Sequence, residues 1–250
     1  MKKKDGLYQS YFIRQGYVCN TPQSDDYTIQ GQQDTLVDSQ IWQYEVYTFA
    51  SRLIKKHHLK SVFDVGCGCA MKIKRLILPL TSDITGIDEP NTIAWNNTHH
   101  DFGMWLADNL ENPQTDLRKK FDIILSVDVI EHLIVPDKLL KFIKKHASPE
   151  TIIVISTPDR NIARSKNDNG PPGNDLHIRE WSLSEFRQYI ENSGFTIIKH
   201  FRVESFTPLA MQKLPRFIRK MAIVMLAWVR LIRLKRYPRD CQVMLLKVSK

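Results

Sequence analysis

Short apolar segments alternate with amphipathic ones through the middle of the chain. The apolar segments are SVFDVG (61–66), DITGID (83–88), FGMWLAD (102–108), FDIILSVD (121–128) and TIIVISTP (151–158). Between them lie stretches with helical spacing of apolar residues, including MKIKRLIL (71–78) and DKLLKFIKKH (137–146). Strands that are apolar on both faces and alternate with helices form parallel sheets covered by helices on both sides. The pattern therefore predicts an α/β fold with a doubly wound parallel sheet.

The regions on either side of this pattern extend the predicted domain. Residues 39–58 show helical spacing and end in basic residues, which suits a helix C-terminus. Residues 182–193 predict another helix, and further strands are expected at 195–205 and 241–248. We therefore expect one domain over residues 39–250 that contains seven strands.

Two polar segments differ from the rest of the chain. Residues 1–38 are polar and turn-rich but hold four tyrosines, so we expect an N-terminal arm that wraps around the domain. Residues 159–180 are too polar and too rich in Gly and Pro to form a core element. Loops of this length in compact domains are usually functional or disordered.

The positive charge of the chain is concentrated in one segment. The 250 residues carry a formal net charge of +9, and nine Lys and Arg with no Asp or Glu fall between Lys213 and Arg239. The remaining 27 basic residues balance the 27 acidic ones. A local charge of this kind argues against a general nucleic-acid-binding surface, so we do not expect nucleic acid as a partner.

This basic segment belongs to an expected helical insertion at residues 205–239, between the last two strands. Drawn as a helix, residues 216–234 place an apolar face opposite a basic one. The apolar run at 221–229 is far shorter than the roughly 20 residues that span a bilayer. A basic amphipathic helix with a tryptophan suits a membrane interface, whereas a lid packed on its own domain explains the pattern equally well. Peripheral membrane contact through residues 213–236 is therefore one of two expectations.

Two features bear on the compartment in which the protein works. The N-terminus has basic residues but lacks the apolar run of a secretory signal. The four cysteines, including Cys67 and Cys69 within one turn, form neither a disulfide framework nor a CxxC pair. Both features favour a reducing cytoplasm, and membrane contact would place the protein at the inner face of the membrane.

A turn with two glycines follows the first predicted strand, in the sequence FDVGCGCA (63–70). A dinucleotide-binding turn has a third glycine, but Met71 occupies that position. Asp64 at the strand end would also repel a pyrophosphate. A carboxylate beside Gly66 and Gly68 instead suits a ligand with a cationic amino-acid group and no phosphate, although an ordinary tight turn would look similar.

Acidic residues also end the next two predicted strands. Asp88 lies about twenty residues beyond the glycine turn, where an acidic side chain can bind both hydroxyls of a ribose. Asp108, followed by Asn109, ends the third strand. Ligands of open α/β sheets bind at the carboxyl ends of the strands, so Asp64, Asp88 and Asp108 should face one crevice. The alternative is that Asp88 and Asp108 each cap a following helix.

At this point the chain resembles the class I S-adenosylmethionine-dependent methyltransferases. Residues 121–133 (FDIILSVDVIEHL) are similar to the branch that contains the ubiquinone-pathway O-methyltransferases, and the resemblance covers roughly residues 40–204. It implies a Rossmann-like sheet of seven strands, mostly parallel with an antiparallel last strand, and S-adenosyl-L-methionine as the methyl donor. The cofactor contacts that it implies are Asp64, Gly66, Cys67, Gly68, Asp88, Asp108, Asn109, Ser126 and Asp128.

Within this resemblance, the glycine turn holds the methionine part, Asp88 the ribose and Asp108 the adenine. The chain departs from the family pattern at Ala70, where a glycine often ends the turn. A methyl group is tolerable there if the φ angle of Ala70 stays negative. A different angle would change the shape of the loop more than the ligand.

The chemistry of methyl transfer directs attention to the end of the fourth strand. A sulfonium methyl is already activated, so the protein must mainly align the acceptor, and an oxygen acceptor must also lose its proton. Glu131, His132 and the loop residue His177 are candidate catalytic groups, with either histidine as general base. Together with Asp128 they also resemble the Mg-binding cluster of small-RNA 2′-O-methyltransferases, and two imidazoles would equally suit Mn²⁺ or Zn²⁺. Similar sequences occur in methyltransferases without a metal, so a metal-free site is our expectation.

The expected function is O-methylation of a small-molecule or glycan-type acceptor in cell-surface polysaccharide or natural-product biosynthesis. The acceptor class depends on the general similarity of residues 170–186 (GPPGNDLHIREWSLSEF) to methyltransferases of that kind. Three alternatives remain: a quinone-precursor O-methyltransferase that collects a lipid-linked acceptor at the membrane, a metal-dependent RNA 2′-O-methyltransferase, and a cofactor-binding protein without catalysis.

Overall fold

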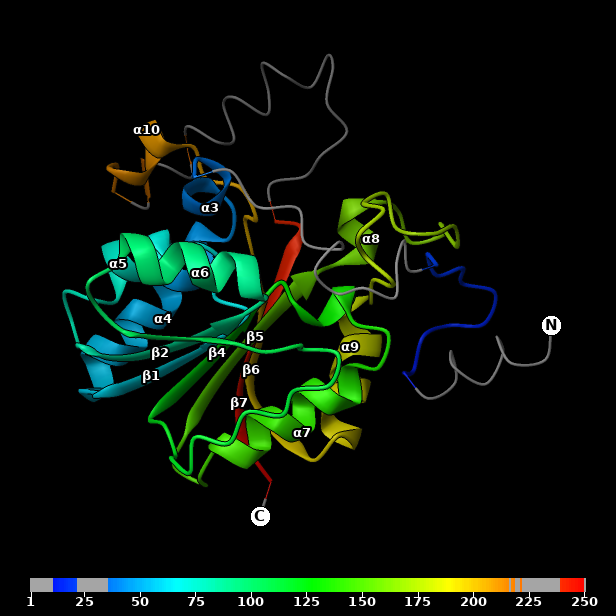
Figure 1. Cartoon of the computed structure of the whole chain (residues 1–250). Helices are drawn as coiled ribbons and strands as arrows, with labels where there is room; N and C mark the ends of the chain where they lie inside the picture. Colours follow the sequence, from blue (N-terminus) through cyan, green and yellow to red (C-terminus); the bar gives the residue numbers. More distant parts are fainter. Residues whose placement is uncertain (1–10, 22–35, 216, 219–220, 222–238, 250) are drawn as a thin grey trace.

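The computed structural model describes residues 11–21, 36–215, 217–218, 221 and 239–249. Its centre is a sheet of seven strands in the order β3-β2-β1-β4-β5-β7-β6 (Figure 1). Neighbouring strands pair in parallel, except that β7 is antiparallel to both β5 and β6. The strands are β1 (Ser61–Val65), β2 (Asp83–Asp88), β3 (Met104–Ala107), β4 (Ile123–Val127), β5 (Ile152–Pro158), β6 (Phe195–Val203) and β7 (Cys241–Val248). The predicted sheet is confirmed, including its antiparallel last strand.

Helices cover both faces of the sheet, with α4, α5 and α6 on one side and α7 and α9 on the other (Figure 1). The longer helices are α4 (Tyr44–His57), α5 (Met71–Leu76), α6 (Pro90–His99), α7 (Pro136–His146) and α9 (Leu183–Asn192). The short ones are α3 (Asp38–Ile41), η1 (Ile130–His132), α8 (Arg160–Ala163) and α10 (Leu209–Gln212).

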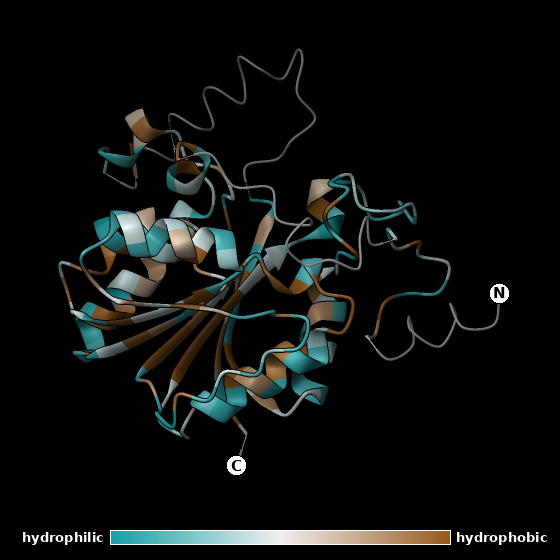
Figure 2. Cartoon of the chain, viewed as in Figure 1, coloured by the Kyte–Doolittle hydropathy of each residue, from teal (hydrophilic) through white to brown (hydrophobic). Residues whose placement is uncertain are grey.

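Alternation along the central strands builds two apolar cores. Val62 and Leu125 pack with α4 and α5 in one core, whereas Phe63 and Ile124 pack with α7 and α9 in the other. Successive side chains of a strand point to opposite faces, so a strand covered on both sides must be apolar throughout. Brown apolar residues accordingly fill the strands in Figure 2, and teal residues lie on the outer faces of the helices.

The helix expected at 39–58 is interrupted. α3 ends at Ile41 and α4 begins at Tyr44, because Gln43 adopts a left-handed conformation with φ 59°. The backbone N–H of Gln43 donates to the carbonyl of Ser205 at 2.6 Å, a contact that a continuous helix would prevent. The periodicity of apolar residues carries no sign of this tertiary contact, which explains the error.

The N-terminal arm is described at residues 11–21, where Tyr11 and Tyr17 are buried. The N–H of Val18 donates to the carbonyl of Asn169 at 2.8 Å. The side-chain amide of Asn20 donates to the carbonyls of Pro172, Asn174 and His177. The arm therefore holds the long loop between β5 and α9.

The expected insertion between the last strands is described only in part. Within residues 205–239 the structure describes α10, which covers residues 209–212, and a few positions beyond it. The amphipathic helix expected at 216–234 lies largely outside the described residues. Among those that are described, no helix has the length and apolar character needed to cross a membrane.

Candidate functional site

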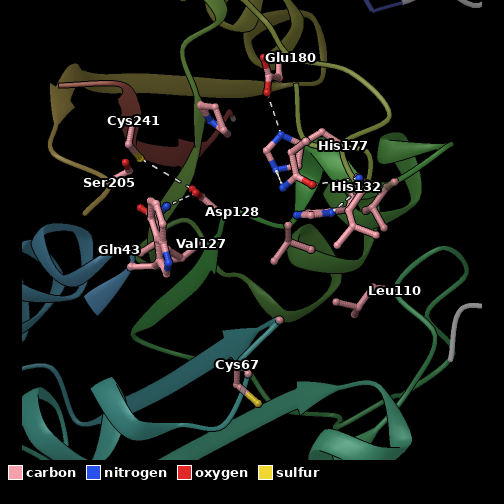
Figure 3. Close-up of a pocket in the computed structure, with 18 of the residues that line it drawn as sticks. Gln43, Cys67, Leu110, Val127, Asp128, His132, His177, Glu180, Ser205 and Cys241 are labelled. Atoms are coloured by element: carbon pink, nitrogen blue, oxygen red, sulfur yellow. Dashed lines mark hydrogen bonds and ion pairs between the residues drawn. The ribbon is translucent and has the colours of Figure 1, made fainter. Parts of the chain in front are cut away.

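A cavity of about 570 Å³ opens at the carboxyl ends of the central strands. This volume is within the usual range for small-molecule sites. Residues from the glycine turn, from β2 and from the segments after β4 and β5 contribute to its wall, as Figure 3 shows in close-up. The predicted site residues among them are Gly66, Cys67, Gly68, Asp88, Asp128, His132 and His177.

The glycine turn between β1 and α5 depends on backbone angles that favour glycine. Gly66 has φ +87°, and a Cβ there would lie 2.2 Å from the Cγ2 of Val129. Gly68 has φ +52°, and a Cβ there would meet no atom within 4 Å. Ala70 at the N-cap of α5 has φ +52°, so the negative angle at which a methyl group is easily tolerated is not adopted. The turn thus exposes backbone to the cavity at Gly68 and packs tightly against the β4 loop at Gly66.

Asp88 at the end of β2 is held by the turn that it faces. Its Oδ2 accepts the N–H of Gly68 and its Oδ1 that of Glu89, both at 2.7 Å. The alternative that Asp88 caps the next helix is wrong, because Glu89 does so by accepting from the N–H groups of Asn91 and Thr92. Asp88 also lines the cavity, where the resemblance implies contact with the ribose hydroxyls.

Asp64 lies deeper than a direct ligand contact would require. Its side chain is fully buried, outside the cavity wall, and accepts a hydrogen bond from the hydroxyl of Tyr47 at 2.8 Å. Burial raises the pKa of Asp64 from 3.8 to about 7, although the nearby Lys72 opposes the shift. Its assignment to the methionine part of the cofactor stays a prediction.

This burial predicts a pH-dependent stability. Because the folded pKa of Asp64 exceeds its unfolded value, its stabilising contribution is present below about pH 4 and is lost as pH rises to about 7, a change of about 4 kcal/mol. We expect Asp64→Asn to gain stability relative to the native protein between about pH 5 and about pH 8. Urea unfolding without ligand measures this, with the exposed Asp101→Asn as the charge control. A stability difference between native and Asp64→Asn proteins that does not change with pH would contradict the expectation.

Asp108 and its neighbours occupy a different setting from the one that the resemblance implies. The Oδ1 of Asp108 accepts the N–H of Asn109, and its Oδ2 accepts those of Gln114 and Thr115, so the carboxylate organises a loop. The structure shows no helix directly after it to cap. Asp108, Asn109 and the fully buried Ser126 all lie outside the cavity wall, and their cofactor roles stay predictions.

Asp128 forms a buried polar cluster at another part of the cavity wall. It adopts φ +53° and accepts hydrogen bonds from the Nε2 of Gln43 and the Sγ of Cys241 (Figure 3). It also accepts one from the Oγ of Ser156. Burial raises the pKa of Asp128 to about 6. Three elements that are distant in sequence therefore meet at this carboxylate, and its side chain is already committed to them.

Glu131, His132 and His177 come together as predicted candidates, but without Asp128. Each residue offers one atom that could bind a metal ion, and these three atoms lie within 4.8 Å of one another. The two imidazole rings pack edge to face with centroids 4.7 Å apart. The Nδ1 of His132 donates to the carbonyl of Leu176 at 3.0 Å. Burial lowers the pKa of His132 to about 3, and the neighbouring His177 adds a smaller decrease, so this ring is neutral.

Both ring nitrogens of the loop residue His177 have side-chain partners. The Nδ1 of His177 lies 2.8 Å from the Oε1 of Glu180, and its Nε2 lies 3.0 Å from the side-chain amide of Asn174. A proton on Nδ1 suits the carboxylate, which leaves the lone pair on Nε2. An imidazole oriented by a carboxylate in this way resembles the base of many hydrolases in its geometry.

The residues fit the two groups that the resemblance implies. For a nucleoside donor with an amino-acid tail, Asp88 lies beside a glycine turn that is open at Gly68, and apolar Leu110 contributes to the same wall. For a divalent cation, both oxygens of Glu131 are buried without a hydrogen-bond partner among the described residues. Burial raises the pKa of Glu131, which a cation would reverse.

Most other residues of the cavity wall were missed by sequence reasoning, among them Trp42, Gln43, Leu110 and the two partners of His177, Asn174 and Glu180. Leu110 follows the acidic end of β3 by a few residues, so a wider search around Asp108 could have found it. Trp42 and Gln43 lie between α3 and α4, which the sequence joins into one predicted helix, and no local signal marks them.

Comparison with known proteins agrees with this geometry. Residues 41–200 match the model of a protein family described as a methyltransferase domain. The chain is 28% identical over 116 residues to the mitochondrial ubiquinone biosynthesis O-methyltransferase of Dictyostelium discoideum. The aligned region covers 41% of this chain and 36% of that relative. The chain therefore spans about a third of the length of that relative.

Solved structures share the fold. An S-adenosylmethionine-dependent methyltransferase from Clostridium acetobutylicum has a TM-score of 0.58 at 11% identity, covering 87% of this chain and 96% of its own. The plantazolicin methyltransferase BpumL, solved with a triazolic desmethylPZN analogue and S-adenosylhomocysteine, has a TM-score of 0.56 at 19% identity and 99% coverage of both chains. With the family match over residues 41–200, these similarities lead to one conclusion: the protein belongs to the methyltransferase domain family and carries a domain with the class I S-adenosylmethionine-dependent methyltransferase fold.

Proposed function

We propose that the protein methylates a hydroxyl group of a small-molecule or glycan-type acceptor. The observation that carries this proposal is the carboxylate-oriented His177 beside His132 in the cavity wall. An alcohol is a poor nucleophile until its proton is removed, so a positioned base has a purpose in O-methylation. S-adenosylmethionine supplies the activated methyl group when it is bound.

In this proposal His177 is the base. Its Nε2 accepts from the amide of Asn174 in the structure, and an acceptor hydroxyl would take the place of that donor. Glu180 fixes the ring through Nδ1 and stabilises the imidazolium that forms. His132 packs against the same ring and limits its rotation. Gly66, Gly68 and Asp88 bind the cofactor on the other side of the cavity.

Replacing His177 with alanine tests this role. We expect kcat to fall about 100-fold or more, since general bases contribute on this scale, with unchanged affinity for S-adenosylhomocysteine. His57→Ala, an exposed position at the end of α4, is the matched control and should keep full activity. If His177→Ala retains the native kcat with an acceptor that the native protein methylates, His177 is not the base.

A cation held by Glu131, His132 and His177 is the second candidate mechanism, and it is favoured by the partnerless buried carboxylate of Glu131. Such a cation would lower the pKa of a bound hydroxyl. Metal content of the purified, cofactor-free protein and thermal shifts with Mg²⁺, Mn²⁺ or Zn²⁺ distinguish the two mechanisms. A shift that Glu131→Gln abolishes would favour the cation over the metal-free base.

The acceptor class can be tested with a panel. BpumL acts on a natural product, and the Dictyostelium relative acts in ubiquinone biosynthesis, so both small-molecule classes belong in it. Saccharides, phenolic quinone precursors and short RNAs should be compared by transfer of a labelled methyl group. Turnover of RNA alone would overturn the proposed acceptor class. Cofactor binding without turnover of any acceptor would favour a binding protein.

A further inference from the structure

Exposed apolar side chains gather in two segments of the described chain. Twelve large apolar residues are exposed there, and eight of them fall within residues 36–37 and 206–221. We name these eight the α3–α10 patch. Its members are Leu36, Val37, Phe206, Leu209, Leu214, Phe217, Ile218 and Met221. Contiguous apolar surface of this kind usually marks an interaction site.

The two segments form one surface. The rings of Trp42 and Phe206 pack with centroids 5.2 Å apart, and the N–H of Thr207 donates to the carbonyl of Ile41 at 2.9 Å. The side-chain amide of Gln212 donates to the carbonyl of Gln40 at 2.8 Å. Figure 1 shows α3 and α10 side by side at the same end of the molecule, and apolar residues of α10 are brown in Figure 2.

This surface adjoins the mouth of the cavity. Trp42, Gln43 and Ser205 line the cavity, and they directly follow α3 or directly precede Phe206. Gln43 also donates to Asp128 inside the cavity. A partner on the α3–α10 patch would therefore lie close to residues of the cavity wall.

The charge around the patch is positive. On α5, the Nζ of Lys72 donates to the carbonyl of Ser39 at 2.6 Å, and Arg75 donates to the side chain of Gln212. Lys213, next to the patch, is exposed. A partner that covers this patch must therefore accept apolar side chains together with the positive charges of Lys72, Arg75 and Lys213.

We propose that the α3–α10 patch docks on an anionic lipid surface. Apolar side chains that insert at the level of the headgroups, surrounded by Lys and Arg, give the combination that peripheral membrane segments use. A nucleic acid would match the charge but not the exposed Phe217 and Met221. Docking would turn the cavity mouth toward the bilayer, where an acceptor with a lipid anchor is concentrated. The inference goes beyond the proposed methyl transfer and does not depend on it.

Vesicle sedimentation of the full chain tests the proposal. We expect binding to phosphatidylcholine vesicles that contain phosphatidylglycerol, with little binding to phosphatidylcholine alone and weaker binding at high salt. The combined variant Val37→Ser, Leu214→Ser, Phe217→Ser and Met221→Ser should bind at least about tenfold more weakly. The matched control is Met104→Ser with Ile198→Ser, two exposed apolar positions outside the patch, and it should bind as the native protein does.

Further measurements separate docking from misfolding and from the enzyme function. Thermal melts and S-adenosylhomocysteine affinity should be the same for both combined variants, since none of these positions lines the cavity. Native protein that stays in the supernatant with anionic vesicles, or equal losses in patch and control variants, would overturn the proposal. A concentration-dependent dimer that the patch variant abolishes would overturn it in favour of a protein partner. None of these outcomes bears on methyl transfer, which is measured with soluble acceptors.

Discussion

Replacing Asp88 with alanine is expected to weaken the binding of S-adenosylhomocysteine about 100-fold or more. Two losses combine in this variant. The ligand loses a carboxylate that can accept from two hydroxyls, and charge-assisted hydrogen bonds are the stronger class. The glycine turn also loses the acceptor of the Gly68 N–H, which Asp88 holds at 2.7 Å. Isothermal calorimetry with the purified protein measures the effect.

Asp88→Asn separates the two losses. Its side-chain oxygen can still accept the N–H of Gly68, but its amide cannot accept from a second hydroxyl and carries no charge. We expect an affinity between those of the native and alanine proteins, with a melting temperature close to native in the absence of ligand. Native affinity in Asp88→Ala would reject the ribose assignment of Asp88.

Gly66→Ala is expected to destabilise the protein by about 3 kcal/mol and to abolish most cofactor binding. The added methyl group would lie 2.2 Å from Val129, and the φ of +87° is a conformation that side chains rarely adopt. To relieve the clash with Val129 or the backbone strain at residue 66, the turn must move away from the loop after β4, which changes the shape of the cavity. Chemical denaturation and calorimetry measure the two effects.

The matched control is Gly173→Ala, where a Cβ would meet no atom within 4 Å and φ is outside the left-handed region. We expect its stability to stay native. Combining Gly66→Ala with Val129→Ala should recover the part of the stability loss that comes from the clash, and the part that comes from φ should remain. A Gly66→Ala protein with native stability and affinity would show that the turn tolerates another shape.

Much of the fold can be predicted from the sequence because the signal is local and repeated. Each central strand is apolar on both faces, as in Val62 and Phe63 of β1, and only burial under helices on two sides explains this. Ser182 and Glu185 form a capping box at the start of α9, so that boundary is also written in adjacent residues. These features need no knowledge of distant contacts.

The site is less predictable because its key contacts join distant residues. The side-chain amide of Gln43 donates to Asp128, which is 85 positions away in the sequence. The backbone N–H of Gln43 donates to the carbonyl of Ser205. Both Gln43 and Asp128 adopt positive φ angles, which no local sequence signal marks. Asp64 has the expected place in the motif, but its burial behind Tyr47 follows from packing that the motif does not specify.

The position of β7 in the sheet has a consequence for how the enzyme is made in the cell. This strand is late in the sequence, yet it pairs with β5 on one edge and β6 on the other, and Cys241 at its start donates to Asp128. A nascent chain that has reached residue 240 therefore carries two strands with unpaired edges and an incomplete cavity. Such edges recruit chaperones or aggregate, so a premature stop codon before residue 241 should yield rapid degradation rather than a partly active product.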